Sequence, residues 1–419
     1  MRMLWKNIKG LVGAYELPPA YLKGTEMRGF SCIENAWLAI EDGKIADFGA
    51  MSDFPGIVDW SGLEVVDCTG RFVLPAWCDS HTHLVFAAPR DGEFLARLEG
   101  KTYQEIAEAG GGILNSAKAL AALPEEELLN SARVRLEQVI RQGTGAIEIK
   151  SGYGLSTEAE LKMLRVIAAL KSEYSIPIRS TFLGCHAVPE GKWTAKSWTA
   201  HVIAELLPKV AEERLADYVD AFCETGYFSV ADTEALLKAA NAFAIQGKIH
   251  VNQFNAIGGV AMGIDCQVLS LDHLEQLSAS DLSALALRAD SEQAPVFACA
   301  LPGCSYFLSI PYTPVRSLMD ANVPVALATD YNPGSAPSGN MSRVVQMGMV
   351  KMKMHPLEAI AAATINGAAA MGVSDVAGTI APGRSANLVL TKPMSGLETL
   401  GYAFGEEPVE KVFIDGVQQ

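Results

Sequence analysis

Two histidines stand two positions apart in the stretch Asp79-Ser-His81-Thr-His83, directly after an apolar run. On extended backbone, side chains at positions i and i+2 point to the same side, so both imidazoles can reach one ion. Neutral imidazole is a ligand for zinc and ferrous iron, and a carboxylate completes such a site while leaving a position open. An H-x-H pair alone is weak evidence, because two structural histidines give the same pattern.

Other polar residues follow further strand candidates at matching positions, namely His186, His250, Asp272, His273 and Asp330. In a barrel of parallel strands, the carboxyl ends of all strands meet at one mouth. We therefore predict that His250 and Asp330 complete a metal site with the H-x-H pair. A divalent cation there would lower the pKa of a bound water toward ~7 and polarise an amide carbonyl.

His273 and Asp330 are the predicted catalytic residues. His273 can orient or deprotonate the attacking water, or donate to the developing oxyanion. The alternative for His273 is a hydrogen-bonded structural histidine at the barrel mouth. Asp330 can serve both as a metal ligand and as a proton shuttle.

The elements that must position these residues form a repeating pattern in the middle of the chain. Short β-branched runs alternate with longer helical stretches, which is typical of βα units around a parallel sheet. Eight such units over about 250 residues fit a closed (β/α)8 barrel, here residues 75–374. The strand candidates are Phe72–Trp77, Gly145–Lys150, Arg179–Gly184, Val219–Glu224, Lys248–Val251, Val268–Asp272, Pro295–Ala300 and Pro324–Thr329. Helical stretches include Pro124–Arg141, Thr157–Glu173, Thr233–Phe243 and Ser278–Arg288.

The two ends of the chain have a different pattern, of short strands and turns. The polar turn Glu41-Asp-Gly-Lys44 separates two apolar runs, and Asp415-Gly416 does the same near the C-terminus. Both patterns predict hairpins. Because each end is too short for a core of its own, we predict that residues 1–74 and 375–419 pair into one small β domain.

The composition argues against several classes of partner. The 419 residues are 49% hydrophobic and carry a formal net charge of -15, so we expect a globular protein that binds neither nucleic acid nor anionic membrane. The eight cysteines include no C-x-x-C pair, and the first residues lack a signal peptide pattern. We therefore expect reduced thiols and a cytoplasmic location.

The motifs taken together resemble the imidazolonepropionases, hydrolases of the amidohydrolase superfamily that act in histidine degradation. The resemblance covers nearly the whole chain and is carried by the segments 79–86, 109–113, 148–155, 181–186, 273–275 and 329–335. It implies a (β/α)8 barrel with a small β-sandwich from both termini. It also implies hydrolysis of 4-imidazolone-5-propanoate to N-formimidoyl-L-glutamate with one zinc or iron ion, held by His81, His83, His250 and Asp330.

The resemblance further implies a set of substrate contacts: Arg90, Tyr103, Tyr153, His186, Gln253, Asn332, Gly334 and Ser335. The planar fork of Arg90 matches the propanoate carboxylate of the substrate. Tyr153 and His186 can hydrogen-bond a polar ring, although both residue types are also common in cores. The turn Asn332-Pro-Gly-Ser335 offers backbone N–H groups to an oxygen, or is a plain turn.

The chain departs from the family pattern at a few positions. Asn252 and Gln253 stand where the family commonly has an acid followed by Gln or Glu, and Cys185 replaces the usual alanine. Gln253 cannot be a general base, so that role moves to His273 or Asp330. Binuclear relatives bridge two metals with a lysine from the fourth strand. That strand here ends in Cys223-Glu224, and Lys150 follows the second strand, so we predict one metal.

Two rival functions remain open. Another mononuclear amidohydrolase, such as a heterocycle aminohydrolase, would release ammonia rather than a ring-opened product. A non-catalytic barrel that senses a small acid would need Arg90 but no metal. Since symmetric pairs are the commonest oligomers, we expect a homodimer.

Overall fold

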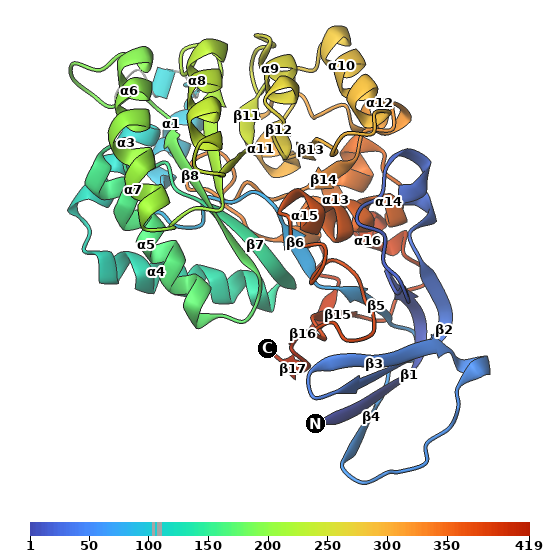
Figure 1. The fold of residues 1–419 in the computed structure, drawn as a ribbon. Helices are drawn as coiled ribbons and strands as arrows, with labels where there is room; N and C mark the ends of the chain where they lie inside the picture. Colours follow the sequence, from blue (N-terminus) through green and yellow to red (C-terminus); the bar gives the residue numbers. More distant parts are fainter. Residues whose placement is uncertain (103–104, 107–110) are drawn as a thin grey trace.

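The computed structural model describes residues 1–102, 105–106 and 111–419 of the chain. It has two parts, a barrel of parallel strands wrapped in helices and a separate sheet made from both chain ends (Figure 1). The predicted fold class, a (β/α)8 barrel with a small β domain from the termini, is confirmed.

The barrel strands are parallel neighbours in the order β14-β13-β12-β11-β9-β8-β7-β6, and their residues are almost all buried. Beyond the ends of β6 and β14, a parallel bridge joins Thr82 to Tyr331. There the Asp330 amide donates to the His81 carbonyl at 3.0 Å, and the His83 amide to the Tyr331 carbonyl at 2.8 Å. The segments that carry His81, His83 and Asp330 therefore lie side by side at this closure. The strands are β6 (Trp77–Asp79), β7 (Thr144–Lys150), β8 (Ile178–Cys185), β9 (Tyr218–Cys223), β10 (Gln246–Gly247), β11 (Ile249–Val251), β12 (Ser270–His273), β13 (Phe297–Ala300) and β14 (Val325–Leu327).

Helices connect successive strands and cover the outside of the barrel (Figure 1). Their starts follow local capping chemistry. Ser156, Ser229 and Ser278 each accept a backbone N–H in the first turn of the helix that follows. The helices are α1 (Asp91–Leu98), α3 (Ile113–Ala122), α4 (Glu125–Arg141), α5 (Thr157–Glu173), α6 (Ala195–His201), the π-helix η3 (Val202–Leu206), α7 (Leu207–Glu212), α8 (Val230–Asn241), α9 (Gly259–Asp265), α10 (Ala279–Ala289), α11 (Pro302–Leu308), α12 (Val315–Asp320), α13 (Met341–Met352), α14 (Pro356–Ala363), α15 (Ile365–Ala370) and α16 (Thr399–Tyr402).

The sheet of the termini is a branched ladder in the order β17-β16-β15-β5-β1-β2-β3, with β4 paired to β1. The predicted hairpin at Asp42-Gly43 is present, and both turn residues have positive φ (48° and 78°), as a tight two-residue turn requires. The Trp5 and Phe413 rings pack edge to face at 4.7 Å and join the two chain ends in one core. Its elements are β1 (Arg2–Val12), β2 (Cys32–Glu41), β3 (Lys44–Ala50), β4 (Leu63–Asp67), β5 (Phe72–Pro75), β15 (Leu388–Thr391), β16 (Val409–Ile414), β17 (Val417–Gln418) and the 3-10 helices η1 (Gly24–Gly29) and η2 (Met51–Asp53).

One strand prediction was wrong. The run Phe72–Trp77, predicted as the first barrel strand, is divided between the two parts of the molecule. Phe72–Pro75 pairs with β1 and β15 in the terminal sheet, and the barrel strand starts only at Trp77. The run is apolar throughout and all of it is buried, so hydrophobicity could not reveal the change of sheet. The boundaries 74/75 and 374/375 between the domains stay a prediction.

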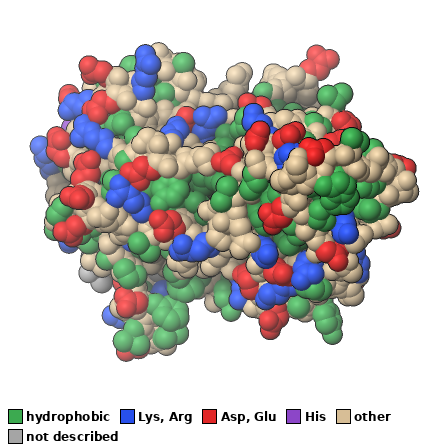
Figure 2. All heavy atoms as spheres, turned by 90° about the horizontal axis from the view of Figure 1, so that it is seen from below, with side chains coloured by type: hydrophobic (Ala, Val, Ile, Leu, Met, Phe, Trp, Pro, Cys, Tyr) green, Lys and Arg blue, Asp and Glu red, His purple; other side chains and the backbone are tan. Residues whose placement is uncertain are grey.

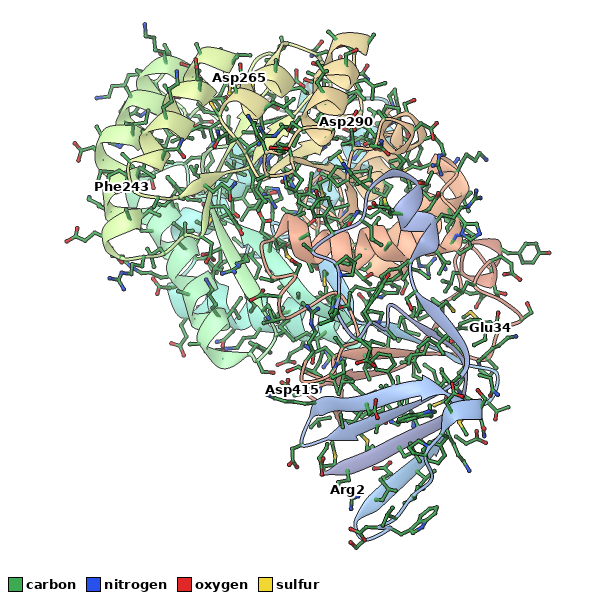
Figure 3. All side chains as sticks on the ribbon, turned by 45° about the vertical axis from the view of Figure 1, so that its right-hand side comes forward. Arg2, Glu34, Phe243, Asp265, Asp290 and Asp415 are labelled. Atoms are coloured by element: carbon green, nitrogen blue, oxygen red, sulfur yellow. The ribbon has the colours of Figure 1, made fainter. Side chains whose placement is uncertain are left out.

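The surface is mixed in charge. On the face seen from below, acidic and basic side chains are interspersed with hydrophobic ones (Figure 2). Arg2 and Asp415 lie on the terminal sheet, far from Asp265 and Asp290 beside the barrel helices (Figure 3).

All eight cysteines are free thiols. Within the described part of the chain, we find no helix that is both long and apolar enough to cross a membrane.

Candidate metal centre

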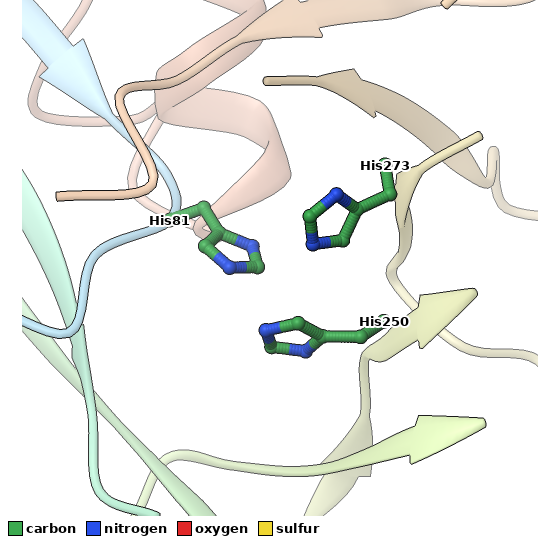
Figure 4. Close-up of side chains that lie close together, drawn as sticks. All are labelled: His81, His250 and His273. Carbon is green, nitrogen blue, oxygen red and sulfur yellow. The ribbon is translucent and has the colours of Figure 1, made fainter. Parts of the chain in front are cut away.

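The four predicted ligands converge at the mouth of the barrel, and all four are buried. The Asp330 Oδ1 atom lies 3.5 Å from His81 Nε2 and 3.5 Å from His83 Nε2. His83 Nε2 lies 3.3 Å from His250 Nε2. Figure 4 shows the rings of His81, His250 and His273 turned toward one common space.

This arrangement fits a metal ion. Ligand atoms that each lie about 2.1 Å from one ion, at angles between about 90° and 110°, are about 3.0–3.4 Å apart. The observed spacings of 3.3 and 3.5 Å fall at or near that range. His81 Nε2 is buried and has no hydrogen-bond partner among the described residues. A bound cation would give this nitrogen the partner that a buried polar atom requires. Three imidazole nitrogens and one carboxylate oxygen are donors suited to zinc or iron.

Two further aspartates orient the ligand histidines. Asp272 Oδ2 contacts His81 Nδ1 at 2.6 Å, and Asp220 Oδ2 contacts His250 Nδ1 at 2.9 Å. When Nδ1 donates to a carboxylate, the lone pair of Nε2 is left for the metal. Sequence reasoning assigned no role to either aspartate. For Asp220, the available signal was a charged residue inside a strand whose other residues are all hydrophobic.

The protonation of the site suits metal binding. Burial lowers the pKa of His81 well below its ordinary value, and the Lys150 charge adds to this effect. Burial likewise lowers the pKa of His83, with His186 contributing. Both imidazoles are therefore neutral and free to bind a cation. Burial raises the pKa of Asp330, against the opposing effect of His273, and a bound cation would favour its ionised form.

His273 stands beside the ligands at the end of β12. Its ring centroid is 5.4 Å from that of His250, and its Nδ1 lies 3.3 Å from Glu275 Oε1. Burial is the largest single influence and lowers the pKa of His273, but Glu275, Asp330 and Asp272 together raise that pKa above its ordinary value. His273 and Asp330 have φ of 84° and 54°, conformations that non-glycine residues rarely adopt and that concentrate at functional sites.

Many of the predicted substrate contacts line a cavity next to this centre. The cavity is lined by His83, Ile113, Tyr153, His186, Phe222, His250, Gln253, His273, Asp330, Asn332 and Ser335. Arg90 is buried, and its guanidinium lies against Gly334. Five of the predicted contacts thus line this cavity, and Arg90 meets Gly334 in the turn that carries two of them, Asn332 and Ser335. Tyr103 lies outside the described residues, as do Ala109 and Gly110 of the glycine-rich motif.

The turn after β14 uses its polar groups internally. Asn332 Oδ1 accepts from the backbone amides of Gly334 and Ser335 at 2.8 and 2.7 Å. The Asn332 amide nitrogen donates to the Asp330 carbonyl at 2.6 Å. These two backbone amides, which the sequence suggested for a ligand oxygen, are therefore already engaged. In the structure Asn332 shapes the loop on which Gly334 meets Arg90.

The positions that depart from the family pattern have distinct surroundings. Asn252 Nδ2 donates to Asp281 Oδ2 at 2.9 Å, and an aspartate at this position would face that carboxylate. The Gln253 amide donates to Cys304 Sγ at 3.2 Å beside the cavity. The Cys185 thiol contacts Thr199 Oγ1 at 3.8 Å. The hydrogen bond to Asp281 therefore explains the amide at position 252 without any role in proton transfer.

Comparisons with known proteins find relatives over nearly the whole chain. The model of the amidohydrolase family matches residues 72–418. An imidazolonepropionase of Flavobacterium johnsoniae is 52% identical over 99% of this chain and 99% of that protein. One from Clostridium tetani is 38% identical over 94% of this chain and 92% of that protein.

Solved structures with the same fold are much more distant in sequence. A zinc-bound adenosine deaminase from Xanthomonas campestris has a TM-score of 0.67 at 17% identity, covering 99% of this chain and 92% of its own. The guanine deaminase of E. coli has a TM-score of 0.69 at 15% identity, covering 100% of this chain and 98% of its own. At these identities the likeness extends to the fold alone.

Proposed function

The chain belongs to the amidohydrolase family and, within it, to the imidazolonepropionases, and on this premise we propose that it hydrolyses 4-imidazolone-5-propanoate to N-formimidoyl-L-glutamate with one divalent metal ion. This places it in histidine degradation. The observation that carries the proposal is the convergence of three imidazoles and one carboxylate from distant parts of the chain. Asp330 Oδ1 lies 3.5 Å from the Nε2 atoms of His81 and His83, and His83 Nε2 lies 3.3 Å from His250 Nε2.

We propose that His81, His83, His250 and Asp330 hold the ion, which is zinc or iron. When bound, such a cation lowers the pKa of a water molecule and polarises the lactam carbonyl. A single ion is favoured because β9 carries no lysine. The Lys150 ammonium is unsuited to bridge a second ion, since Glu148 and Asp220 already hold it at 2.6 and 2.9 Å.

The chain's own residues position the substrate. Arg90 holds the propanoate through its planar fork, next to Gly334. Tyr153 and His186 line the cavity, and their ring centroids are 5.4 Å apart. The pKa of His186 is lowered to about 3, first by burial, so its ring faces the substrate in the neutral form. We keep Tyr103, Gln253, Asn332 and Ser335 as further proposed contacts.

His273 and Asp330 move the protons. With His273 Nδ1 held by Glu275, its Nε2 is the nitrogen that takes the proton from the attacking water. Water adds to the lactam carbonyl carbon, and the carbon–nitrogen bond of the ring then breaks. The ring nitrogen receives the proton as it leaves, which gives the open-chain formimidoyl product. The Gln253 amide can donate but cannot accept this proton.

The experiment is turnover of imidazolone propionate, with the product identified and ammonia measured in the same reaction. Formimidoylglutamate without ammonia supports the proposal. Release of ammonia would instead support the rival aminohydrolase, and binding of the substrate without turnover would support a sensing role.

We further propose that the protein works as a cytoplasmic homodimer on this small-molecule substrate. Its eight free thiols suit a reducing compartment. Its net charge of -15 opposes binding to nucleic acid and to anionic membranes. Sedimentation of the purified protein tests the dimer directly.

A further inference from the structure

Five charged side chains form a buried cluster behind the metal ligands, contributed by β7, β9, β12 and the residue that precedes β11. The cluster consists of Glu148, Lys150, Asp220, Lys248 and Asp272, and each side chain is 0% exposed. Three carboxylates face two ammonium groups. The proposed reaction uses none of these five residues directly, yet burying so many charges is costly unless they are paired in a defined geometry.

Lys150 makes the contacts that matter most for the metal ligands. Its Nζ lies 2.9 Å from Asp220 Oδ2 and 3.6 Å from Asp272 Oδ2. These are the same two oxygen atoms that hold His250 Nδ1 and His81 Nδ1, at 2.9 and 2.6 Å. One ammonium group therefore lies behind both of the carboxylates that orient ligand histidines.

Removing this group would disturb both histidines together. Without the ammonium, two buried carboxylate oxygens lose a shared cation and are free to turn toward Lys248 or to admit water. If either carboxylate rotated, its histidine would lose the hydrogen-bond acceptor that fixes the orientation of the imidazole ring. Groups that hold a ligand histidine typically change metal affinity by about 10- to 100-fold when they are lost.

Lys248 offers a matched comparison within the same cluster. It is equally buried and forms an ion pair with Glu148. It also contacts the carbonyl oxygens of Ser80 and Ala370, at 3.0 and 3.1 Å, and lies 5.7 Å from the centre of the Tyr218 ring. It has no ion pair with Asp220 or Asp272 among the described residues. Both lysines are fully buried and pair with Glu148, but only Lys150 also contacts the two aspartates that hold ligand histidines.

We propose that Lys150 is a positioning residue, whose ammonium fixes the Asp220 and Asp272 oxygens so that His81 and His250 present Nε2 to a single ion. The inference rests on the proposed metal centre. It assigns a role to the lysine of the segment 148–155, which the hydrolytic steps leave unexplained.

The test compares two double variants that change the cluster's charge equally. Glu148→Gln with Lys150→Met removes one positive and one negative charge, and with them the ammonium group behind both aspartates. Glu148→Gln with Lys248→Met removes the same charges and leaves Lys150 in place. Zn²⁺ affinity is measured by competition with a chromophoric chelator. The visible spectrum of the Co²⁺-loaded proteins reports the ligand geometry.

The Lys150 double variant should bind Zn²⁺ about 10- to 100-fold more weakly, with an altered Co²⁺ spectrum. The Lys248 double variant should stay within about threefold of the unchanged protein and keep its spectrum. Equal losses in both variants, or no loss in the first, would overturn the proposal.

A second pair covers the case in which a double variant does not fold. Lys150→Arg and Lys248→Arg keep each charge but change its shape, and only Lys150→Arg should weaken Zn²⁺ binding; equal effects would overturn the proposal. Turnover of the unchanged protein is measured alongside. If it binds one Zn²⁺ but does not open the imidazolone ring, the proposed function fails while the role of Lys150 is still decided by affinity.

Discussion

Replacing Gly334 by alanine should damage substrate binding through one defined contact. A Cβ added at this position would overlap the Arg90 guanidinium, and its three nearest neighbours are all atoms of that group. Gly334 does not adopt a positive φ, so alanine suits the backbone there. The guanidinium, at the end of a flexible side chain, is therefore the part that must move.

The expected size follows from what Arg90 does. Hydrogen bonds to a charged group contribute about 1.5 to 3 kcal/mol. Since about 1.4 kcal/mol corresponds to a factor of ten, a displaced fork should lower kcat/KM by about 10- to 150-fold. Crowding a packed site costs about 1 to 3 kcal/mol of stability, so the variant should remain folded.

The assay is steady-state hydrolysis of imidazolone propionate, with thermal unfolding of the same samples. Gly92→Ala is the control, because a Cβ there meets nothing within 4 Å although it lies two residues from Arg90. In an Arg90→Met background, Gly334→Ala should have little further effect on kcat/KM. Full activity of Gly334→Ala, or full additivity with Arg90→Met, would refute the reasoning.

Three further predictions concern proton transfer, acid stability and a departure from the family pattern. His273→Asn should lower kcat by about 10²- to 10⁴-fold with KM changed only a few-fold, as stopped assays at saturating substrate can check. Because burial lowers the pKa of His186 to about 3, the unfolded state binds the extra proton below about pH 6.5 and stability falls as pH drops. At pH 4.5 this loss is roughly 2 to 3 kcal/mol, so the free energy of unfolding of His186→Asn, measured with urea, should fall less steeply toward acid pH. If it falls as steeply as in the unchanged protein, the lowered pKa of His186 is not the cause. Asn252→Asp would face Asp281 and should lower the free energy of unfolding by about 1 to 3 kcal/mol at pH 7, and an equally stable variant would exclude that repulsion.

Much of the architecture could be predicted because it depends on local patterns. The alternation of apolar runs and helical stretches gave the barrel, and the Glu41–Lys44 turn gave a hairpin that the structure confirms. The convergence of His81, His83, His250 and Asp330 followed from one rule, that parallel strands share a mouth. The distances now found among these side chains are consistent with that rule.

The remainder depends on contacts between distant segments, which spacing does not encode. The apolar run Phe72–Trp77 gave no sign that it changes sheet at Ala76, because hydrophobicity is the same in both sheets. Asp220 and Lys150 meet across 70 positions of sequence, so their partnership is visible only once the barrel is closed. Asn332 satisfies its own turn, which a turn motif alone does not distinguish from a ligand contact.

The most direct test of the account is a metal titration of chelator-stripped protein. Zn²⁺ or Fe²⁺ is added in steps, and bound metal and hydrolysis of imidazolone propionate are measured on the same sample. Activity should rise linearly and stop at one ion per chain, and His250→Ala should neither bind the ion tightly nor recover activity. Full activity in the stripped protein, or a break at two ions per chain, would contradict a single catalytic metal held by these four residues.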